Sequence, residues 1–460
     1  MNAPRRVVSF VAWSTALLLG FSIAAYAWNV SWTPFNRINL ISDLVHADSI
    51  QSATVETTSV PDSATQAANL PARRFERYRT AAQIINFQTD SNRYALPHFL
   101  ERLHTLRQTK KGKIRIAYFG DSMIEGDLMT QTLRELLQKN FGGTGVGYVP
   151  ITSIVAGFRQ TVRSEYSRGW SDRSFKQNPG NAPLYLSGHA FSSQSDWARY
   201  TDRTRGDSSL LIQKYLLCGP DSNASIQFQQ QERLITANGS FNRILLSTDA
   251  GRTLSLSATS NTPTLYGVSF ESPDGIILDN FSFRGITGIE LAKLSANWLQ
   301  AIQQQQPYDL IVFQYGVNLL FRPMDKDFRW YGKAMQPVIE RFKQTFPNAD
   351  VLVVSTADRA FRYSGGWASA VGIDSLVAVQ AKAAFQSDVA FYNQFATMGG
   401  TNSIVDWANR NPAWAGKDYV HPNARGAAWL GESLYKAILR EYRLYTASIN
   451  RAKPKPANTP

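Results

Sequence analysis

The stretch KGKIRIAYFGDSMIEG, residues 111–126, decides the fold. Its apolar run Ile114–Phe119 predicts a short buried strand, a Gly-Asp-Ser turn follows at 120–122, and a helix is predicted from there to about Lys139. Strand, turn and helix in this order place Ser122 at the carboxyl end of a parallel strand, where open α/β sheets bind their ligands. The hydroxyl would lie beside a helix N-terminus, whose free amides favour negative charge. Gly-Asp-Ser is also ordinary turn chemistry, so the rest of the chain has to decide its role.

Length and charge narrow the class of protein. A chain of 460 residues predicts two folded units plus extensions. The formal charge is +13, but the lysines and arginines are scattered, so we expect weak attraction to anionic envelope polymers and no nucleic-acid partner. The single cysteine, Cys218, excludes an intramolecular disulfide, and its apolar surroundings predict a buried small side chain.

The N-terminus predicts export. Two arginines precede an uncharged run, Val7–Trp28, which is long enough to span a bilayer as a helix. The basic flank should stay in the cytoplasm, so residues 1–28 are predicted to anchor the chain in the inner membrane with the rest in the periplasm. The alternative is a signal peptide cleaved after Ala-Tyr-Ala at 25–27. Residues 29–71, rich in Ser, Thr and Ala towards their end, are predicted to form a flexible tether.

The patterns of strand-forming, helix-forming and turn residues divide the chain after residue 71 into four parts. Residues 72–150 and 272–446 alternate buried-strand and helix patterns, which predicts a three-layer α/β/α domain with a parallel sheet. Between them, residues 151–271 carry short β-forming runs separated by turn residues, which predicts an inserted all-β sandwich or jelly roll. The Pro-rich basic tail 447–460 is predicted to be disordered.

Within the α/β parts, individual elements follow from local patterns. Two helices are predicted within residues 72–109, and the glycine-rich segment 141–151 is interpreted as a flexible boundary. It lacks the Gly-Lys-Ser/Thr ending of a phosphate loop. A helix is predicted to open at Gly285-Ile-Thr-Gly288 and to run to about Gln304. Later strands are predicted at Gly275–Arg284, Asp309–Tyr315, Asp350–Ser355 and Val389–Tyr392, and later helices at about 328–345, 373–386 and 424–445.

Four short motifs then fall in order along the chain. They are the Gly-Asp-Ser turn at 120–122, Gly288 at a helix start, Gly316-x-Asn318 after a strand, and Asp418-x-x-His421 before the last helix. In these motifs the chain resembles the SGNH (GDSL-type) hydrolase superfamily, over about residues 111–147 and 275–445. It also resembles exported peptidoglycan O-acetylesterases, whose SGNH domain is interrupted by a β-sandwich similar to a carbohydrate-binding module.

Residue chemistry supports a nucleophilic site independently of the resemblance. A serine hydroxyl is barely ionised at neutral pH, so Ser122 needs a neighbouring base. Of the five histidines, we expect His421 alone to reach it from a loop at the sheet edge. Asp418, three residues earlier, can orient and stabilise the imidazole, and Asp358 is the alternative acid. No cluster has metal-ligand spacing, so neither a metal nor a cofactor is predicted.

The resemblance implies the oxyanion donors. They are the backbone amides of Ser122 and Gly288 and the side-chain amide of Asn318, with Gly285 as a rival to Gly288. Leu319 stands where many superfamily members have Asp, which puts the local loop geometry in question.

These observations favour an envelope esterase that removes O-acetyl groups from peptidoglycan or another polysaccharide. Three alternatives stay open: an O-acetyltransferase with the same triad, a lipid esterase, and a non-catalytic glycan-binding protein that uses the β insert.

Overall fold

The computed structural model describes residues 74–88, 94–178, 182–205, 210–220, 224–236 and 239–452. All described residues belong to one compact unit. The predicted anchor 1–28 and tether 29–71 therefore lie outside the described residues. In the described part of the chain, no helix is both long and apolar enough to cross a membrane.

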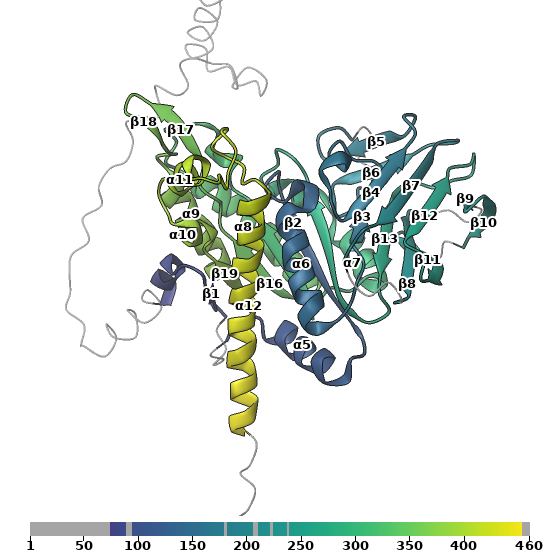
Figure 1. The fold of residues 1–460 in the computed structure, drawn as a ribbon, viewed down its shortest axis with the longest axis horizontal. Coiled ribbons are helices and arrows are strands. Elements are labelled where there is room, and N and C mark those ends of the chain that lie inside the picture. The colour runs from purple at the N-terminus through teal and green to yellow at the C-terminus, as the bar shows by residue number, and fades with distance from the viewer. Residues whose placement is uncertain are drawn as a thin grey trace, which may run out of the picture. The chain divides into compact units, whose positions relative to one another are not determined.

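The central sheet is parallel apart from one edge strand (Figure 1). Its order is β1 (Ile84–Ile85), β19 (Ala390–Tyr392), β16 (Asp350–Val354), β15 (Leu310–Gln314), β2 (Lys113–Gly120) and β14 (Gly275–Ser282), with β1 antiparallel to β19. The chain leaves β2 for a neighbour on one side, β14, and then crosses to the other side, β15. Such a reversal at the carboxyl ends of the strands is where doubly wound sheets place a ligand site.

Helices cover both faces of this sheet, as predicted for a three-layer domain. Along β2, Ala117 and Phe119 contribute to one buried apolar cluster, whereas Ile116 and Tyr118 contribute to another. The first cluster packs against α7 (Ala296–Gln305), α8 (Arg329–Thr345) and α9 (Ile373–Gln386). The second packs against α5 (Pro97–Thr109), α6 (Leu128–Phe141), α11 (Ser403–Asn409) and α12 (Ala424–Ala452), and the short α10 (Gln394–Met398) touches both.

Two antiparallel sheets form the β region. One has the order β11 (Asn242–Asp249), β8 (Ile212–Cys218), β13 (Leu265–Glu271), β6 (His189–Ser192) and β5 (Ser171–Ser174), with β3 (Gly147–Val149) also paired to β13. The other has the order β10 (Gln231–Ile235), β9 (Ala224–Phe228), β12 (Thr253–Ser257), β7 (Trp197–Asp202) and β4 (Val162–Tyr166). Residues from both sheets share one buried cluster, so the sheets pack as a sandwich. Its status as a separate inserted domain stays a prediction.

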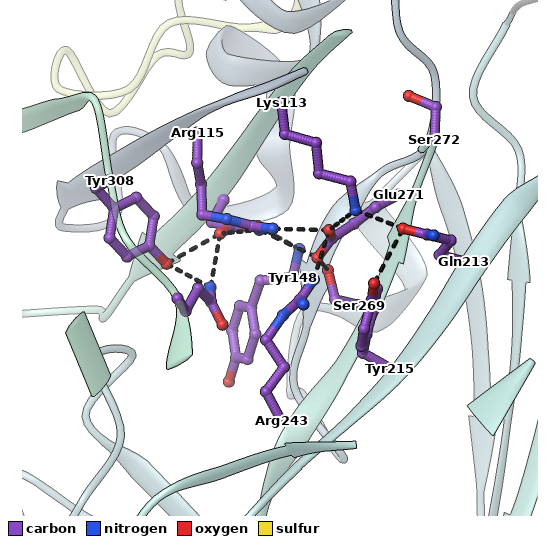
Figure 2. Close-up of polar contacts among 12 residues, drawn as sticks. Lys113, Arg115, Tyr148, Gln213, Tyr215, Arg243, Ser269, Glu271, Ser272 and Tyr308 are labelled. Carbon is purple, nitrogen blue, oxygen red and sulfur yellow. Dashed lines mark hydrogen bonds and ion pairs between the residues drawn. The ribbon is translucent and has the colours of Figure 1, made fainter. Parts of the chain in front are cut away.

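A buried ionic cluster joins the sandwich to the parallel sheet (Figure 2). Arg115 of β2 donates to Glu271 of β13 at 2.7 Å and to Asp279 of β14 at 3.2 Å. Lys113 and Arg243 also contact Glu271, at 2.9 and 2.6 Å. The side chain of Glu271 is fully buried, which opposes its ionisation, but the three cations outweigh burial and hold its pKa well below the usual range.

Three local predictions need correction. Among the described residues between 74 and 109, only one long helix, α5, forms, because Ile84 and Ile85 pair with β19 as a buried edge strand. The helix predicted from Gly288 to Gln304 breaks into η5 (Ile289–Lys293) and α7, since the side chain of Ser295 accepts a hydrogen bond from Trp298 N and caps a new helix. Helix α12 continues to Ala452, so residues 447–452 of the predicted disordered tail are helical.

The glycine-rich segment 141–151 is also not the flexible boundary that was predicted. It is mostly buried and passes close to β13 and β14. A Cβ atom at Gly145 would lie 2.3 Å from Phe270 O, and one at Gly147 would lie 2.7 Å from Leu278 O. Both glycines have positive φ, so the residue type serves close backbone contact here.

Candidate active site

Three of the predicted residues form one chain of hydrogen bonds at the carboxyl end of the parallel sheet. Ser122 follows β2 by two residues, and its Oγ lies 2.9 Å from His421 Nε2. His421 Nδ1 lies 2.7 Å from Asp418 Oδ2. The side chains of His421 and Asp418 are 43% and 51% exposed, so water and a substrate can reach them. This arrangement can move a proton from the serine hydroxyl to an oriented imidazole.

Asp418 is held as a carboxylate. Its partial burial opposes ionisation, but hydrogen bonds from the His421 ring and from the amides of His421 and Val420 outweigh burial and lower its pKa. An ionised Asp418 fixes the imidazole orientation and stabilises the imidazolium that forms when His421 takes a proton.

The loop that carries His421 is fastened to a hairpin that the sequence reasoning missed. This hairpin consists of β17 (Ala360–Tyr363) and β18 (Gly366–Ser369). Ala360 N donates to Tyr419 O at 3.0 Å, and the rings of Trp367 and Tyr419 stack with centroids 4.0 Å apart. The Gly-Gly pair at 365–366 is a turn signal that indicates a hairpin. Local patterns do not show that this hairpin contacts the loop of Tyr419.

Asn318 connects the two segments that carry the other predicted oxyanion donors, Ser122 and Gly288. Its Nδ2 donates to Ile286 O at 2.9 Å and to Asp121 Oδ2 at 3.2 Å. Both amide hydrogens are therefore engaged, and Asn318 must release one of them, the longer contact first, to donate to a substrate oxygen. Leu319, the departure from the superfamily pattern, starts η6 (Leu319–Phe321), and its amide donates to Gly316 O at 2.9 Å.

Gly288 lies at the entry of η5 with φ 94°. A Cβ atom there would come within 2.6 Å of the Tyr315 ring, so only glycine fits this position without displacing the ring. The rival Gly285 is exposed and lies three residues earlier in the same loop.

Asp121 braces the turn that presents Ser122. It is buried, and its Oδ1 accepts a hydrogen bond from Met123 N at 2.9 Å while Oδ2 accepts from Asn318. Burial raises its pKa to about 7, although backbone amides, including that of Gly316, act in the opposite direction. Asp121 therefore couples the nucleophile turn to the loop of Asn318.

The alternative acid, Asp358, and the histidines that were not expected to reach Ser122 have other partners in the described residues. The alternative acid Asp358 is buried and accepts hydrogen bonds from Ser369, Ser403 and Ile404 instead of His421. His104 contacts Tyr442 and Gln108, and His189 contacts Asp172. In the described ranges, no group of three or more His, Cys, Asp or Glu residues is placed to hold a metal ion.

Arg359 is a residue of this site that no sequence signal indicated. Its Nη1 donates to Val317 O at 2.7 Å, next to Asn318, and its charge interacts with Asp418. Burial lowers the pKa of Arg359, and the nearby Asp418 carboxylate acts to raise it. Arg359 thus connects the loop of the predicted oxyanion donor to the predicted triad acid.

Comparison with known proteins places the fold. No protein-family model matches the sequence, and no curated protein matches it. Among solved structures, a peptidoglycan O-acetylesterase aligns with 78% of this chain and 99% of its own length, at 20% identity and a TM-score of 0.66. A family two carbohydrate esterase from Cellvibrio japonicus aligns with 62% of this chain and 99% of its own length, at 9% identity and a TM-score of 0.26. An acetyl xylan esterase aligns with 36% of this chain and 83% of its own, at 18% identity and a TM-score of 0.29.

The chain therefore has an SGNH (GDSL-type) hydrolase fold, which confirms the predicted resemblance at the level of the fold. In particular, it has the fold of the peptidoglycan O-acetylesterase, since the TM-score of 0.66 extends over nearly that whole protein. The two lower scores add nothing to this conclusion. A shared fold does not fix a substrate, so the activity has to be argued from the site.

Proposed function

We propose that this protein is a serine esterase that removes O-acetyl groups from peptidoglycan or another polysaccharide of the bacterial cell envelope. The observation that carries the proposal is the unbroken chain from Ser122 Oγ through His421 to Asp418, with contacts of 2.9 and 2.7 Å. Nucleophile, base and orienting acid within hydrogen-bond reach are the signature of acyl transfer through serine. The fold shared with a peptidoglycan O-acetylesterase supports the choice of an acetyl ester.

The mechanism follows from the positions of these groups. Ser122 Oγ attacks the acetyl carbonyl carbon while His421 Nε2 takes the hydroxyl proton, and Asp418 stabilises the imidazolium. The amides of Ser122, Gly288 and Asn318 are proposed to bind the carbonyl oxygen as it becomes an oxyanion. The sugar oxygen leaves with the proton from His421, and an acetyl-Ser122 ester remains. Water, deprotonated by His421, then releases acetate and restores the serine.

Hydrolysis is favoured over acetyl transfer because the base is open to solvent. The side chain of His421 is 43% exposed, so water can reach the acyl-enzyme without displacing protein groups. A transferase needs a sugar hydroxyl to react in preference to that water.

We also propose that the protein acts in the envelope. Support comes from the uncharged run Val7–Trp28 behind two arginines, which is read as an uncleaved inner-membrane anchor.

The proposal is tested with the purified protein and its Ser122→Ala variant. The wild type should release acetate from O-acetylated peptidoglycan or an acetylated polysaccharide and should hydrolyse 4-nitrophenyl acetate. Denaturing mass spectrometry of the wild type quenched during turnover should show a mass gain of one acetyl group on the peptide that contains Ser122. Full activity in Ser122→Ala would exclude the proposed nucleophile. A mass gain on an added oligosaccharide, instead of free acetate, would assign transfer.

A further inference from the structure

A cleft of about 250 Å³ opens beside the loop that carries Ser122. One wall is η2 (Glu125–Asp127) together with Ser282 and Phe283 at the end of β14. The sandwich contributes further lining residues, including Asp172, Lys176 and His189. Its volume is slightly below the ~300–1,000 Å³ of clefts that hold drug-sized ligands, so it suits a ligand the size of one sugar ring.

This cleft adjoins the candidate active site through the backbone. Glu125 is three residues beyond Ser122, and Phe283 N donates to Gly120 O at 3.0 Å, at the start of the nucleophile turn. The chain that follows Phe283 leads directly to Gly288. A polymer with one residue at Ser122 can therefore place a neighbouring residue in the cleft.

Two of the three acids that line the cleft are paired with arginines, and the third, Asp172, contacts the ring of His189. Glu125 contacts Arg284 at 2.6 Å, Asp127 contacts Arg159 at 3.5 Å, and Asp172 contacts His189 at 2.9 Å. Lys176 is different: among the described residues, no carboxylate lies within 4.0 Å of its Nζ. Glu125 and Asp127 are already held by Arg284 and Arg159, so they are poor competitors for this ammonium group.

Lys176 and His189 both face the segment that leads to Gly288. Lys176 Nζ lies 5.7 Å from the centroid of the Phe283 ring, and a Cβ atom at Gly285 would lie 3.1 Å from that nitrogen. The His189 ring stacks on Phe283 with centroids 4.8 Å apart. Because Asp172 engages Nδ1 of His189, Nε2 is left to contact a hydroxyl group.

We propose that the cleft is a subsite for a carboxylate-bearing unit of the acetylated glycan, next to the unit that loses its acetyl group. Lys176 provides the ionic contact with the carboxylate, and His189 Nε2 binds a sugar hydroxyl. The formal charge of +13 draws an acidic polymer towards the protein from a distance. This inference rests on the proposed esterase function and specifies its substrate class. The carboxylate can belong to a uronic acid ring or to the lactyl-peptide side chain of peptidoglycan.

Binding tests the subsite without relying on catalysis. The full-length wild type is titrated with oligogalacturonate, with acetate-free muropeptides, and with neutral xylo-oligosaccharide as the uncharged comparison. We expect Lys176→Ala to weaken binding of one acidic ligand by about tenfold, as for loss of a charge-assisted hydrogen bond, and Lys176→Arg to retain most of it. The acidic ligand that responds identifies the source of the carboxylate.

The control variant removes the same charge elsewhere. Lys139→Ala changes an exposed lysine that does not line the cleft, so it reports the effect of net charge alone. Equal weakening by Lys139→Ala and Lys176→Ala, or no weakening by Lys176→Ala, would overturn the subsite.

Kinetics separate this inference from the proposed function. In Lys176→Ala, kcat/KM should fall about tenfold more for an acetylated acidic glycan than for acetylated xylo-oligosaccharide, mainly through KM. If the wild type hydrolyses both substrates and the variant lowers both equally, the subsite is wrong and the esterase stands. If the wild type hydrolyses no acetyl ester, the proposed function fails, and the binding result alone decides whether the cleft recognises carboxylates.

Discussion

Strand β2 has a charged site near each end, and the two sites differ in their exposure to water; Figure 2 shows the one near the amino end. Beyond its carboxyl end, Ser122, His421 and Asp418 form a chain in which the histidine and the acid are about half exposed. Near its amino end, Arg115 binds Glu271, and both side chains are almost fully buried. The exposed site can exchange protons with water and substrate. The buried site excludes both and joins two sheets, so charge by itself does not mark an active site.

This comparison predicts that the two sites fail differently when they are mutated. Groups at the carboxyl end should affect the rate and leave stability almost unchanged. Groups at the amino end should affect stability and leave the rate of the folded molecules almost unchanged. A variant at the carboxyl end that lowers stability without lowering the rate would contradict the proposed mechanism. A variant at the amino end that lowers the rate of the folded molecules without lowering stability would contradict the structural role of the ionic cluster.

The largest effect is expected for His421→Ala. Without the base, Ser122 keeps its proton, so kcat for 4-nitrophenyl acetate should fall by about 10⁴–10⁶-fold. The free energy of unfolding should change by less than about 1 kcal/mol, because the side chain is 43% exposed. Steady-state kinetics and urea unfolding give both numbers. A loss of less than tenfold in kcat would show that another group acts as the base.

Glu271→Ala should lower the free energy of unfolding by about 3–5 kcal/mol, because it leaves Arg115 buried without one of its carboxylate partners. Urea unfolding measures this loss, and kcat per folded molecule should stay near that of the wild type. The matched control is Glu76→Ala, which removes an acid that pairs with Arg79 at an exposed position. Exposed pairs contribute about 0–1 kcal/mol. Equal effects from the two variants would contradict the structural role of the cluster.

The sequence predicted the parts of this site that depend on local pattern. The buried run before Ser122 requires an interior strand, and a turn followed by a helix exposes the hydroxyl, so both follow from adjacent residues. His421 was singled out because it alone of the five histidines falls in a loop that follows the last predicted strand and precedes the last predicted helix. The predicted boundaries of α9, 373–386, agree with the structure because the apolar residues of this helix are regularly spaced.

What the sequence could not predict depends on contacts between distant segments. The two-residue strand β1 has no period of its own and exists because it pairs with β19, about 300 positions later. Arg359 becomes part of the site through one hydrogen bond to Val317 O, and nothing near it in the sequence indicates that contact. The cluster around Glu271 likewise unites residues from four strands, β2, β11, β13 and β14, and no single stretch contains its pattern.

Asn318→Ala tests the oxyanion donor at the carboxyl end. Loss of one such donor typically costs about 2.7–4 kcal/mol of transition-state stabilisation. We expect the lower part of this range, about 100-fold in kcat, because Asn318 also has to release a contact with Asp121 before it can donate. KM should change little if the interaction forms in the transition state. A rise in KM with unchanged kcat would assign Asn318 to substrate binding instead.

The smallest effect concerns Asp121 and compares two fully buried carboxyl groups. Burial raises the pKa of Asp121 to about 7, whereas cations lower that of Glu271. For Asp121 the folded state keeps a proton that the unfolded state loses, so the stabilisation is present below about pH 4 and is lost as the pH rises through 7. For Glu271 the sign is opposite, and its stabilisation is lost in acid.

Urea unfolding between pH 5 and 7 tests the prediction for Asp121. The wild type should lose about 2 kcal/mol of unfolding free energy relative to Asp121→Asn, which cannot titrate. A difference that does not vary with pH would mean that Asp121 is ionised throughout, and the brace between the nucleophile turn and Asn318 would then be a charged hydrogen bond.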